Sequence, residues 1–166
     1  MSELMEGAPA IAEAAVRAGC RFYAGYPITP STEILEYLSA RMSEVGGVCM
    51  NAESEIEGIG MVWGAAATGA RAMIASTGQG ISLMQESFAE MAVARIPFLA
   101  VNMARGQSDY FQATRGGGHG DYRFIVFSPA SVQEAADHVA LAFDLGERYR
   151  IPTMILGDFL LGHVRL

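Results

Sequence analysis

Six short apolar runs recur along the chain, and their starts lie about 23 to 29 residues apart. Each run is followed by a helix-like pattern or by a glycine-rich loop. This interval suits one strand, one helix and two short connections, so the spacing predicts repeated βα units. The predicted strands are Arg21–Gly25, Val48–Asn51, Arg71–Ser76, Phe98–Asn102, Phe124–Phe127 and Thr153–Leu156. We therefore expect an α/β fold, a doubly wound and mainly parallel six-stranded sheet with helices on both faces.

Five helices are predicted between these strands, from apolar residues that recur at helical spacing. They are Ala8–Ala18, Ser31–Met42, Glu53–Thr68, Ile81–Ala94 and Ser131–Tyr149. The last begins with Ser131-Val132-Gln133-Glu134, a capping box that satisfies amide groups at a helix start. The stretch Ala104–Asp121 contains Gly116-Gly117-Gly118-His119-Gly120 and is predicted to be an irregular loop that is functional or mobile.

The predicted helix Glu53–Thr68 is poor in large side chains. It holds Gly58, Gly60 and Gly64, and each glycine inside a helix costs about 0.5–1 kcal/mol relative to alanine. A closely packed neighbour has to compensate this loss. We therefore expect the helix to be buried in an interface, against another helix or another subunit.

Charge and cysteine content exclude several classes of function. The net charge of −7 and the lack of a basic run argue against nucleic acid and anionic membranes as partners. Cys20 and Cys49 are isolated, so no disulfide framework, iron–sulfur site or other metal site held by this chain alone is expected. The acidic start and the lack of an apolar run of about 18 residues predict a cytoplasmic protein. A length of 166 residues fits one domain, 1–166.

Polar residues and glycines gather directly after the predicted strands. In open α/β sheets, ligands bind beyond the carboxyl ends of the strands. The sequence therefore predicts a site along this edge of the sheet, with Thr29, Glu55, Ser76 and Arg105 beside one another.

The segment Tyr26-Pro27-Ile28-Thr29-Pro30 is the most distinctive part of this edge. Its prolines keep the backbone extended and present Thr29 in a fixed direction. The segment is also typical of a helix start, with Thr29 as the N-cap and Pro30 in the first helical position. The turn Ser76-Thr77-Gly78-Gln79-Gly80 resembles a phosphate-binding loop, but it lacks the ending of a P-loop and is a weak nucleotide signature.

Three ionisable side chains at this edge are candidates for chemistry. Glu55 lies in the first turn of the glycine-rich helix, where burial raises a carboxyl pKa and the helix N-terminus lowers it. Alternatively, Glu53, Glu55 and Glu57 are ordinary first-turn acids. Arg105 ends a predicted strand and can hold a carboxylate, or it forms a surface ion pair. His119 lies in the glycine loop and is either a proton shuttle or a solvent-exposed side chain.

Together these loops resemble the N-terminal domain of the alpha subunit of 2-oxoacid:ferredoxin oxidoreductases, which are thiamine-diphosphate enzymes. The segments that carry the resemblance are Gly25–Ser31, Ala52–Ile56, Gly80–Glu86, Asp109–Thr114, Gly116–Tyr122 and Ser131–Glu134. Their order and spacing agree with the family's, and the similarity covers essentially the whole chain. The glycine-rich loop is most similar to the branch that contains the 2-oxoisovalerate and 2-oxoglutarate enzymes.

The resemblance implies that the chain is the pyrimidine-binding half of a thiamine-diphosphate site. Glu55 matches the family's catalytic glutamate, which hydrogen-bonds N1′ of the aminopyrimidine and promotes loss of the thiazolium C2 proton. Thr29 and Arg105 match the positions that hold the 2-oxoacid, with Arg105 facing its carboxylate. The cofactor-binding positions implied in this way are Tyr26, Pro27, Ile28, Glu55, Ser76 and Thr77.

Two features depart from the family pattern. The chain lacks an extra loop that relatives carry between Gly106 and Gln107, and it stops at Leu166, before the family's later domains. It also lacks the family's diphosphate motif, since Gly157-Asp158-Phe159 does not match it. We therefore expect a beta subunit to supply the Mg²⁺ and diphosphate site and the iron–sulfur cluster, in a homo- or hetero-oligomer.

The leading hypothesis is oxidative decarboxylation of a 2-oxoacid to an acyl-CoA, with coenzyme A as second substrate and ferredoxin as electron acceptor. Two alternatives remain open. The chain could be the pyrimidine-binding subunit of a two-chain thiamine-dependent 2-oxoacid decarboxylase. It could instead be an assembly module without catalytic activity.

Overall fold

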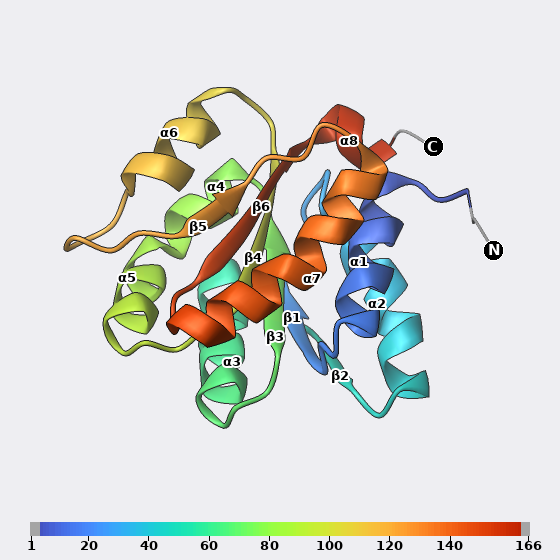
Figure 1. Cartoon of the computed structure of the whole chain (residues 1–166), viewed down its shortest axis with the longest axis horizontal. Helices are drawn as coiled ribbons and strands as arrows, with labels where there is room; N and C mark the ends of the chain where they lie inside the picture. The colour runs from blue at the N-terminus through green and yellow to red at the C-terminus, as the bar shows by residue number, and fades with distance from the viewer. Residues whose placement is uncertain (1–3, 164–166) are drawn as a thin grey trace.

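One parallel sheet organises the computed structural model, which describes residues 4–163 (Figure 1). Its strand order is β2-β1-β3-β4-β6-β5, and every neighbouring pair is parallel. The strands are β1 (Phe22–Gly25), β2 (Val48–Asn51), β3 (Ala72–Ser76), β4 (Leu99–Ala104), β5 (Ile125–Phe127) and β6 (Thr153–Asp158). All six strands expected from the sequence are present, so the α/β fold is confirmed, and the sheet is wholly rather than mainly parallel.

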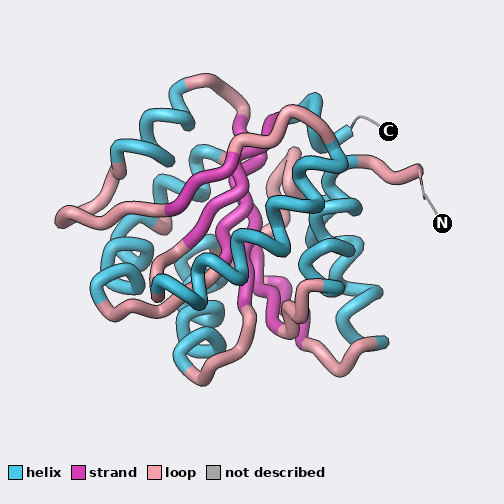
Figure 2. Tube along the Cα trace, in the orientation of Figure 1, coloured by secondary structure: helices cyan, strands magenta, loops and turns pink. Residues whose placement is uncertain are grey.

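Helices cover both faces of this sheet (Figures 1 and 2). On one face lie α1 (Gly7–Arg17), α2 (Thr32–Glu44) and α7 (Val132–Tyr149). On the other lie α3 (Glu55–Ala67), α4 (Gly78–Leu83), α5 (Gln85–Val93) and α6 (Ser108–Arg115). A short helix, α8 (Phe159–His163), follows β6 and contacts α1. Between residues 4 and 163, no helix is both long enough and apolar enough to cross a bilayer.

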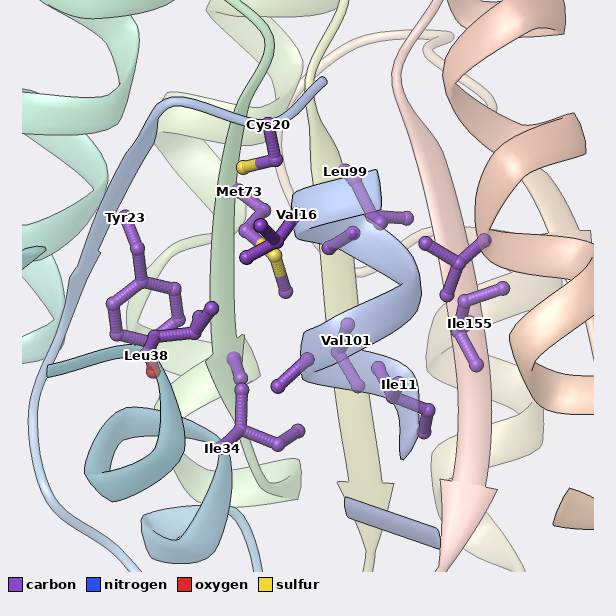
Figure 3. Close-up of a cluster of buried hydrophobic side chains, with 14 of the residues drawn as sticks. Ile11, Val16, Cys20, Tyr23, Ile34, Leu38, Met73, Leu99, Val101 and Ile155 are labelled. Carbon is purple, nitrogen blue, oxygen red and sulfur yellow. The ribbon is translucent and has the colours of Figure 1, made fainter. Parts of the chain in front are cut away.

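The buried side chains form two clusters, because alternate residues of a strand point to opposite faces of the sheet. Met73, Leu99, Val101 and Ile155 point into the layer under α1 and α2, where Ile11 packs against them (Figure 3). Their neighbours along the strands, such as Ile74, point into the layer under α3 and α5. Strands that are apolar on both faces are the reason why the sequence shows continuous apolar runs.

The capping box predicted for α7 is present. The Ser131 hydroxyl accepts the Glu134 N–H at 3.2 Å, and the Glu134 carboxylate accepts the Ala130 N–H at 2.7 Å. These bonds satisfy two of the amide groups that a helix start leaves without an intrahelical partner.

The predicted single helix Ile81–Ala94 is wrong, because the structure divides it into α4 and α5 at Met84. In a continuous helix the Ile81 carbonyl would accept the backbone N–H of Gln85. Here the side-chain amide of Gln85 donates to that carbonyl, at 3.0 Å. The Ile81 carbonyl also accepts the backbone N–H of Met84, at 3.3 Å, so a tighter turn and a side chain take the place of the regular helical bond at this point.

The expectation of an irregular loop over Ala104–Asp121 is also wrong in part, since α6 lies within it. Asp109 in its first turn and Arg115 in its last turn match the helix dipole, and Ala113 packs inward. Gly116, at φ 84°, ends the helix in a conformation that a side chain would strain. The irregular parts of the stretch are 105–107, before α6, and the segment from Gly116 onward.

Candidate functional site

The carboxyl edge of β1, β3 and β4 brings the predicted site residues together. These three strands are neighbours in the sheet, so their ends lie side by side. Glu55 and Ser76 form one contact at this edge, and Thr29 and Arg105 form a second. The four side chains therefore share one edge of the molecule, as the sequence predicted.

Glu55 is the first residue of α3, and its side chain is only 5% exposed. The hydroxyl of Ser54 caps the helix by accepting the Glu57 N–H at 3.2 Å, and Glu57 Oε2 accepts the Glu53 N–H at 2.8 Å. Glu53 and Glu57 are exposed and belong to this cap, whereas Glu55 points inward. The alternative that all three are equivalent first-turn acids is therefore wrong.

The buried carboxylate of Glu55 lies beside the end of β3. Ser76 is fully buried, and its hydroxyl donates to Glu55 Oε1 at 3.4 Å. Gly80 of α4 covers this pair. A Cβ at position 80 would lie 2.0 Å from Ser76 Oγ and 2.6 Å from Glu55 Oε1. Position 80 therefore requires glycine, because only glycine lets α4 approach the carboxylate so closely.

Arg105 follows the end of β4 and reaches across β3 to the loop after β1. Its Nε donates to the backbone carbonyl of Thr29 at 2.8 Å, and its Nη2 donates to the same oxygen. Among the described residues Arg105 takes part in no salt bridge, so the surface ion pair considered from the sequence is wrong. The guanidinium instead joins two loops of the site edge.

The proline-containing loop has a different geometry from the predicted helix start. The Thr29–Pro30 peptide bond is cis, and α2 begins at Thr32 with Ser31 in the N-cap position. The Ser31 hydroxyl donates to the Ile28 carbonyl at 2.8 Å instead of accepting from the helix. The roles of Thr29 as N-cap and Pro30 as first helical residue are therefore wrong, because Ser31 takes the boundary position.

The implied cofactor positions divide into exposed and buried groups. Tyr26 is 39% exposed, Pro27 is exposed and Ile28 is half-buried. Ser76 and Thr77 are fully buried. Among the described residues, the Thr77 hydroxyl has no hydrogen-bond partner, which leaves it available to a ligand.

A further buried polar side chain, Asn102, lies at the same edge. It pairs with Ser76 in the register of β4 and β3, so both side chains lie on the sheet face that α3 covers. Asn102 is fully buried, and within residues 4–163 neither atom of its amide is hydrogen-bonded. An asparagine inside the apolar run of β4 is unusual, and this was the signal in the sequence. Asn102 was not identified from the sequence as a site residue.

His119 is exposed and belongs to the loop after α6. The glycines beside it have a structural role, since the N–H groups of Gly117 and Gly118 donate to the Tyr122 hydroxyl at 3.3 and 3.2 Å. That hydroxyl in turn donates to Gln85 at the start of α5. The structure does not bring His119 into contact with Glu55 or Arg105 through any of these bonds.

Two hollows flank α6 at the site edge. A cleft of about 630 Å³ lies between α6 and α8, beyond the ends of β4 and β6. A second hollow of about 480 Å³ lies between α4 and α6. Arg105 and Gly106 line both. A small molecule bound by Arg105 therefore has space on either side of α6.

Known proteins match this chain over nearly its full length. The family model described as "Pyruvate flavodoxin/ferredoxin oxidoreductase, thiamine diP-bdg" matches residues 13–165. The 2-oxoglutarate synthase subunit KorA of Methanothermobacter thermautotrophicus is 46% identical over 97% of this chain and 46% of the relative. The ketoisovalerate oxidoreductase subunit VorB of the same organism is 43% identical over 98% of this chain and 49% of the relative.

A solved structure shares the fold. The 2-oxoglutarate:ferredoxin oxidoreductase from Magnetococcus marinus, with 2-oxoglutarate, coenzyme A and succinyl-CoA bound, superposes with a TM-score of 0.93 at 33% identity. The match covers 97% of this chain and 30% of that one. The chain spans about half the length of the curated relatives above. It belongs to the pyruvate flavodoxin/ferredoxin oxidoreductase family, in the thiamine-diphosphate-binding domain, which confirms the family expected from the sequence.

Proposed function

We propose that this family member provides the aminopyrimidine-binding half of a thiamine-diphosphate site in a 2-oxoacid:ferredoxin oxidoreductase. The enzyme would oxidatively decarboxylate a 2-oxoacid to an acyl-CoA and pass the electrons to ferredoxin. The observation that carries the proposal is the buried carboxylate of Glu55 at the carboxyl edge of the sheet. Its acidic neighbours Glu53, before α3, and Glu57, on α3, are exposed, so burial is particular to Glu55.

The residues around Glu55 fit an aminopyrimidine. A carboxylate that is cut off from water needs a donor, and the long 3.4 Å contact with Ser76 satisfies only part of its capacity. Thr77 and Asn102 add unpartnered polar atoms at the same edge, which favours a polar ligand there. Gly80 brings the backbone of α4 against one side of the pair and adds no side chain there.

In the proposed mechanism Glu55 acts at N1′ of the pyrimidine. When bound, thiamine diphosphate would supply the carbon nucleophile for the 2-oxo carbon and would hold the electron pair that the departing CO₂ leaves behind. The Glu55 carboxylate would accept a hydrogen bond from the protonated N1′ and stabilise the proton there. Burial strengthens this interaction, since water does not compete for the carboxylate.

Arg105 and Thr29 are proposed to hold the 2-oxoacid. The guanidinium of Arg105 is already oriented by the Thr29 carbonyl, and such a planar donor group matches a carboxylate in two parallel hydrogen bonds. The hydroxyl of Thr29 lies in the same loop and is exposed to an incoming substrate. Tyr26, Pro27 and Ile28 are proposed to contact the cofactor beside it.

A partner chain is proposed to supply the metal and cluster ligands that the described residues of this chain do not provide. Within the described part of the chain, no three His, Cys, Asp or Glu side chains lie close enough to hold a metal ion. We place the Mg²⁺ and diphosphate site and the iron–sulfur cluster on a beta subunit. The face of α3 that carries Gly60 and Gly64 is open, with no atom within 4 Å of a Cβ built at either position, and it is the proposed contact with that subunit.

The experiment that tests this function compares two matched variants in the enzyme assembled with its beta subunit. Glu55→Gln should lower the rate of 2-oxoacid-dependent ferredoxin reduction by about 10²- to 10⁴-fold, the usual contribution of a general acid–base group. Glu57→Gln removes an exposed carboxylate of the same turn and should keep at least half of the wild-type rate. Full activity in Glu55→Gln would exclude the proposed role. Product formation that needs neither coenzyme A nor ferredoxin would instead favour the decarboxylase.

A further inference from the structure

The walls of the cleft between α6 and α8 carry large apolar side chains. Tyr110 and Phe111 of α6 line one side, and their rings meet edge to face with centroids 5.8 Å apart. Phe159 and Leu160 of α8 line the opposite side. All four side chains are more than half exposed, at 54, 60, 52 and 70%. Large apolar side chains are expected to find a partner or ligand when they gather around one hollow.

The cleft has one charged side chain of each sign among the described residues that line it. Arg105 is the cationic side chain and Asp158 is the acidic one. Asp158 Oδ1 accepts the Leu161 N–H at 2.8 Å, which fixes the carboxylate at the start of α8. The cleft can therefore neutralise one carboxylate, at Arg105, and its far side repels another.

A 2-oxoacid always carries one carboxylate, next to its oxo group. Substrates of the class differ in the side chain, which is a second carboxylate in 2-oxoglutarate and a hydrocarbon in 2-oxoisovalerate. A second carboxylate placed between Phe111 and Leu160 would lose its hydration without gaining a cation, and it would lie near Asp158. A branched alkyl or aryl side chain would bury its surface there without such a penalty.

We infer that the cleft between α6 and α8 receives the side chain of the substrate, and that the substrate is a 2-oxoacid with an apolar, branched alkyl or aryl side chain. The inference rests on the proposed function and names its substrate class. The carboxylate of the substrate lies at Arg105, and the side chain lies against Tyr110, Phe111 and Leu160. The comparisons leave this choice open, since relatives of similar identity are named for 2-oxoglutarate and for ketoisovalerate.

The first test measures kcat/KM of the assembled enzyme for 2-oxoisovalerate, phenylpyruvate and 2-oxoglutarate. At least one of the two apolar substrates should exceed 2-oxoglutarate by about tenfold or more, the usual effect of matching an apolar pocket. Saturation-transfer NMR on the same enzyme gives a readout apart from turnover. The methyl protons of 2-oxoisovalerate should receive saturation, and Phe111→Ser should weaken that signal.

The second test changes the charge of the cleft. Leu160 is 70% exposed, so Leu160→Lys should fold normally while adding a cation to the wall. It should raise kcat/KM for 2-oxoglutarate relative to 2-oxoisovalerate by about tenfold. Leu141→Lys is the matched control, because Leu141 is a partly exposed leucine of α7 outside the cleft, and it should leave the ratio unchanged.

The outcomes separate this inference from the proposed function. A wild-type preference for 2-oxoglutarate, or an unchanged substrate ratio in Leu160→Lys, would overturn the inference and leave the role of Glu55 intact. Failure of the assembled enzyme to exchange the thiazolium C2 proton of thiamine diphosphate would overturn the proposed function itself.

Discussion

Replacing Gly80 by alanine tests whether α4 is packed against the buried Glu55–Ser76 pair. The new Cβ would lie 2.0 Å from Ser76 Oγ and 2.6 Å from Glu55 Oε1, far inside normal contact distance. Both side chains are buried, at 5% exposure or less, and they cannot move into solvent without opening the site. Overpacking of this kind destabilises a protein by about 1–3 kcal/mol. For a chain of this size the melting temperature should fall by about 2–12 °C.

The assays are thermal and urea denaturation, each followed by the fluorescence of Trp63, the only tryptophan of the chain. Gly60→Ala is the matched control, because no atom lies within 4 Å of a Cβ placed at that position and alanine favours a helix by about 0.5–1 kcal/mol over glycine. It should therefore raise the midpoint. Adding Ser76→Ala to Gly80→Ala removes the closest clash and should restore part of the loss. A wild-type midpoint in Gly80→Ala would refute the close packing of α4.

Three further perturbations test other parts of the account. Burial raises the pKa of Glu13, but hydrogen bonds from Arg17, Arg41 and Tyr37 outweigh it and bring the pKa below its ordinary value of 4.5. Its stabilising effect is therefore present above about pH 5 and lost as the pH falls through the lowered pKa, so wild type and Glu13→Gln should differ in urea midpoint at pH 6, and the difference should shrink as the pH is lowered below 4.5. Gly60→Leu should prevent association with the beta subunit in size-exclusion chromatography while the chain stays folded, and normal assembly would place the interface elsewhere. Arg105→Ala should lower kcat/KM by about 10²-fold or more, and Arg105→Lys should raise mainly KM, because it keeps the charge and loses the planar donor pair. A wild-type KM in Arg105→Ala would remove Arg105 from the substrate site.

The strands and most helices could be predicted because their signals are local. Apolar runs such as Ala72–Ser76 are buried on both faces of the sheet. The capping box that begins at Ser131 has the residue types that a helix start needs. The break at Met84 could not be predicted in this way. It depends on the side chain of Gln85, whose carbonyl oxygen is fixed by Tyr122, far away in the sequence. Contacts between residues far apart in the sequence therefore decide whether this segment forms one helix or two.

In the candidate site, too, some features have a local signal in the sequence and others depend on tertiary contacts. Glu55 shares a helix face with Gly58, Ile59 and Val62, so the helical repeat already distinguishes it from Glu53 and Glu57. The hydrogen-bond partner of Arg105 is a backbone carbonyl, and no pattern of side chains in the sequence predicts such a contact. Asn102 is similar, since one polar residue in an apolar strand gains meaning only when its neighbours and its burial are known.

The most direct test of the central claim is the rate of hydrogen–deuterium exchange at the thiazolium C2 of thiamine diphosphate in the assembled enzyme. This rate reports on the cofactor and Glu55 without 2-oxoacid, coenzyme A or ferredoxin. The account predicts that Glu55→Gln slows the exchange by about 10²-fold or more while Glu57→Gln keeps the wild-type rate. An unchanged rate in Glu55→Gln would contradict the assignment of the buried carboxylate to the cofactor.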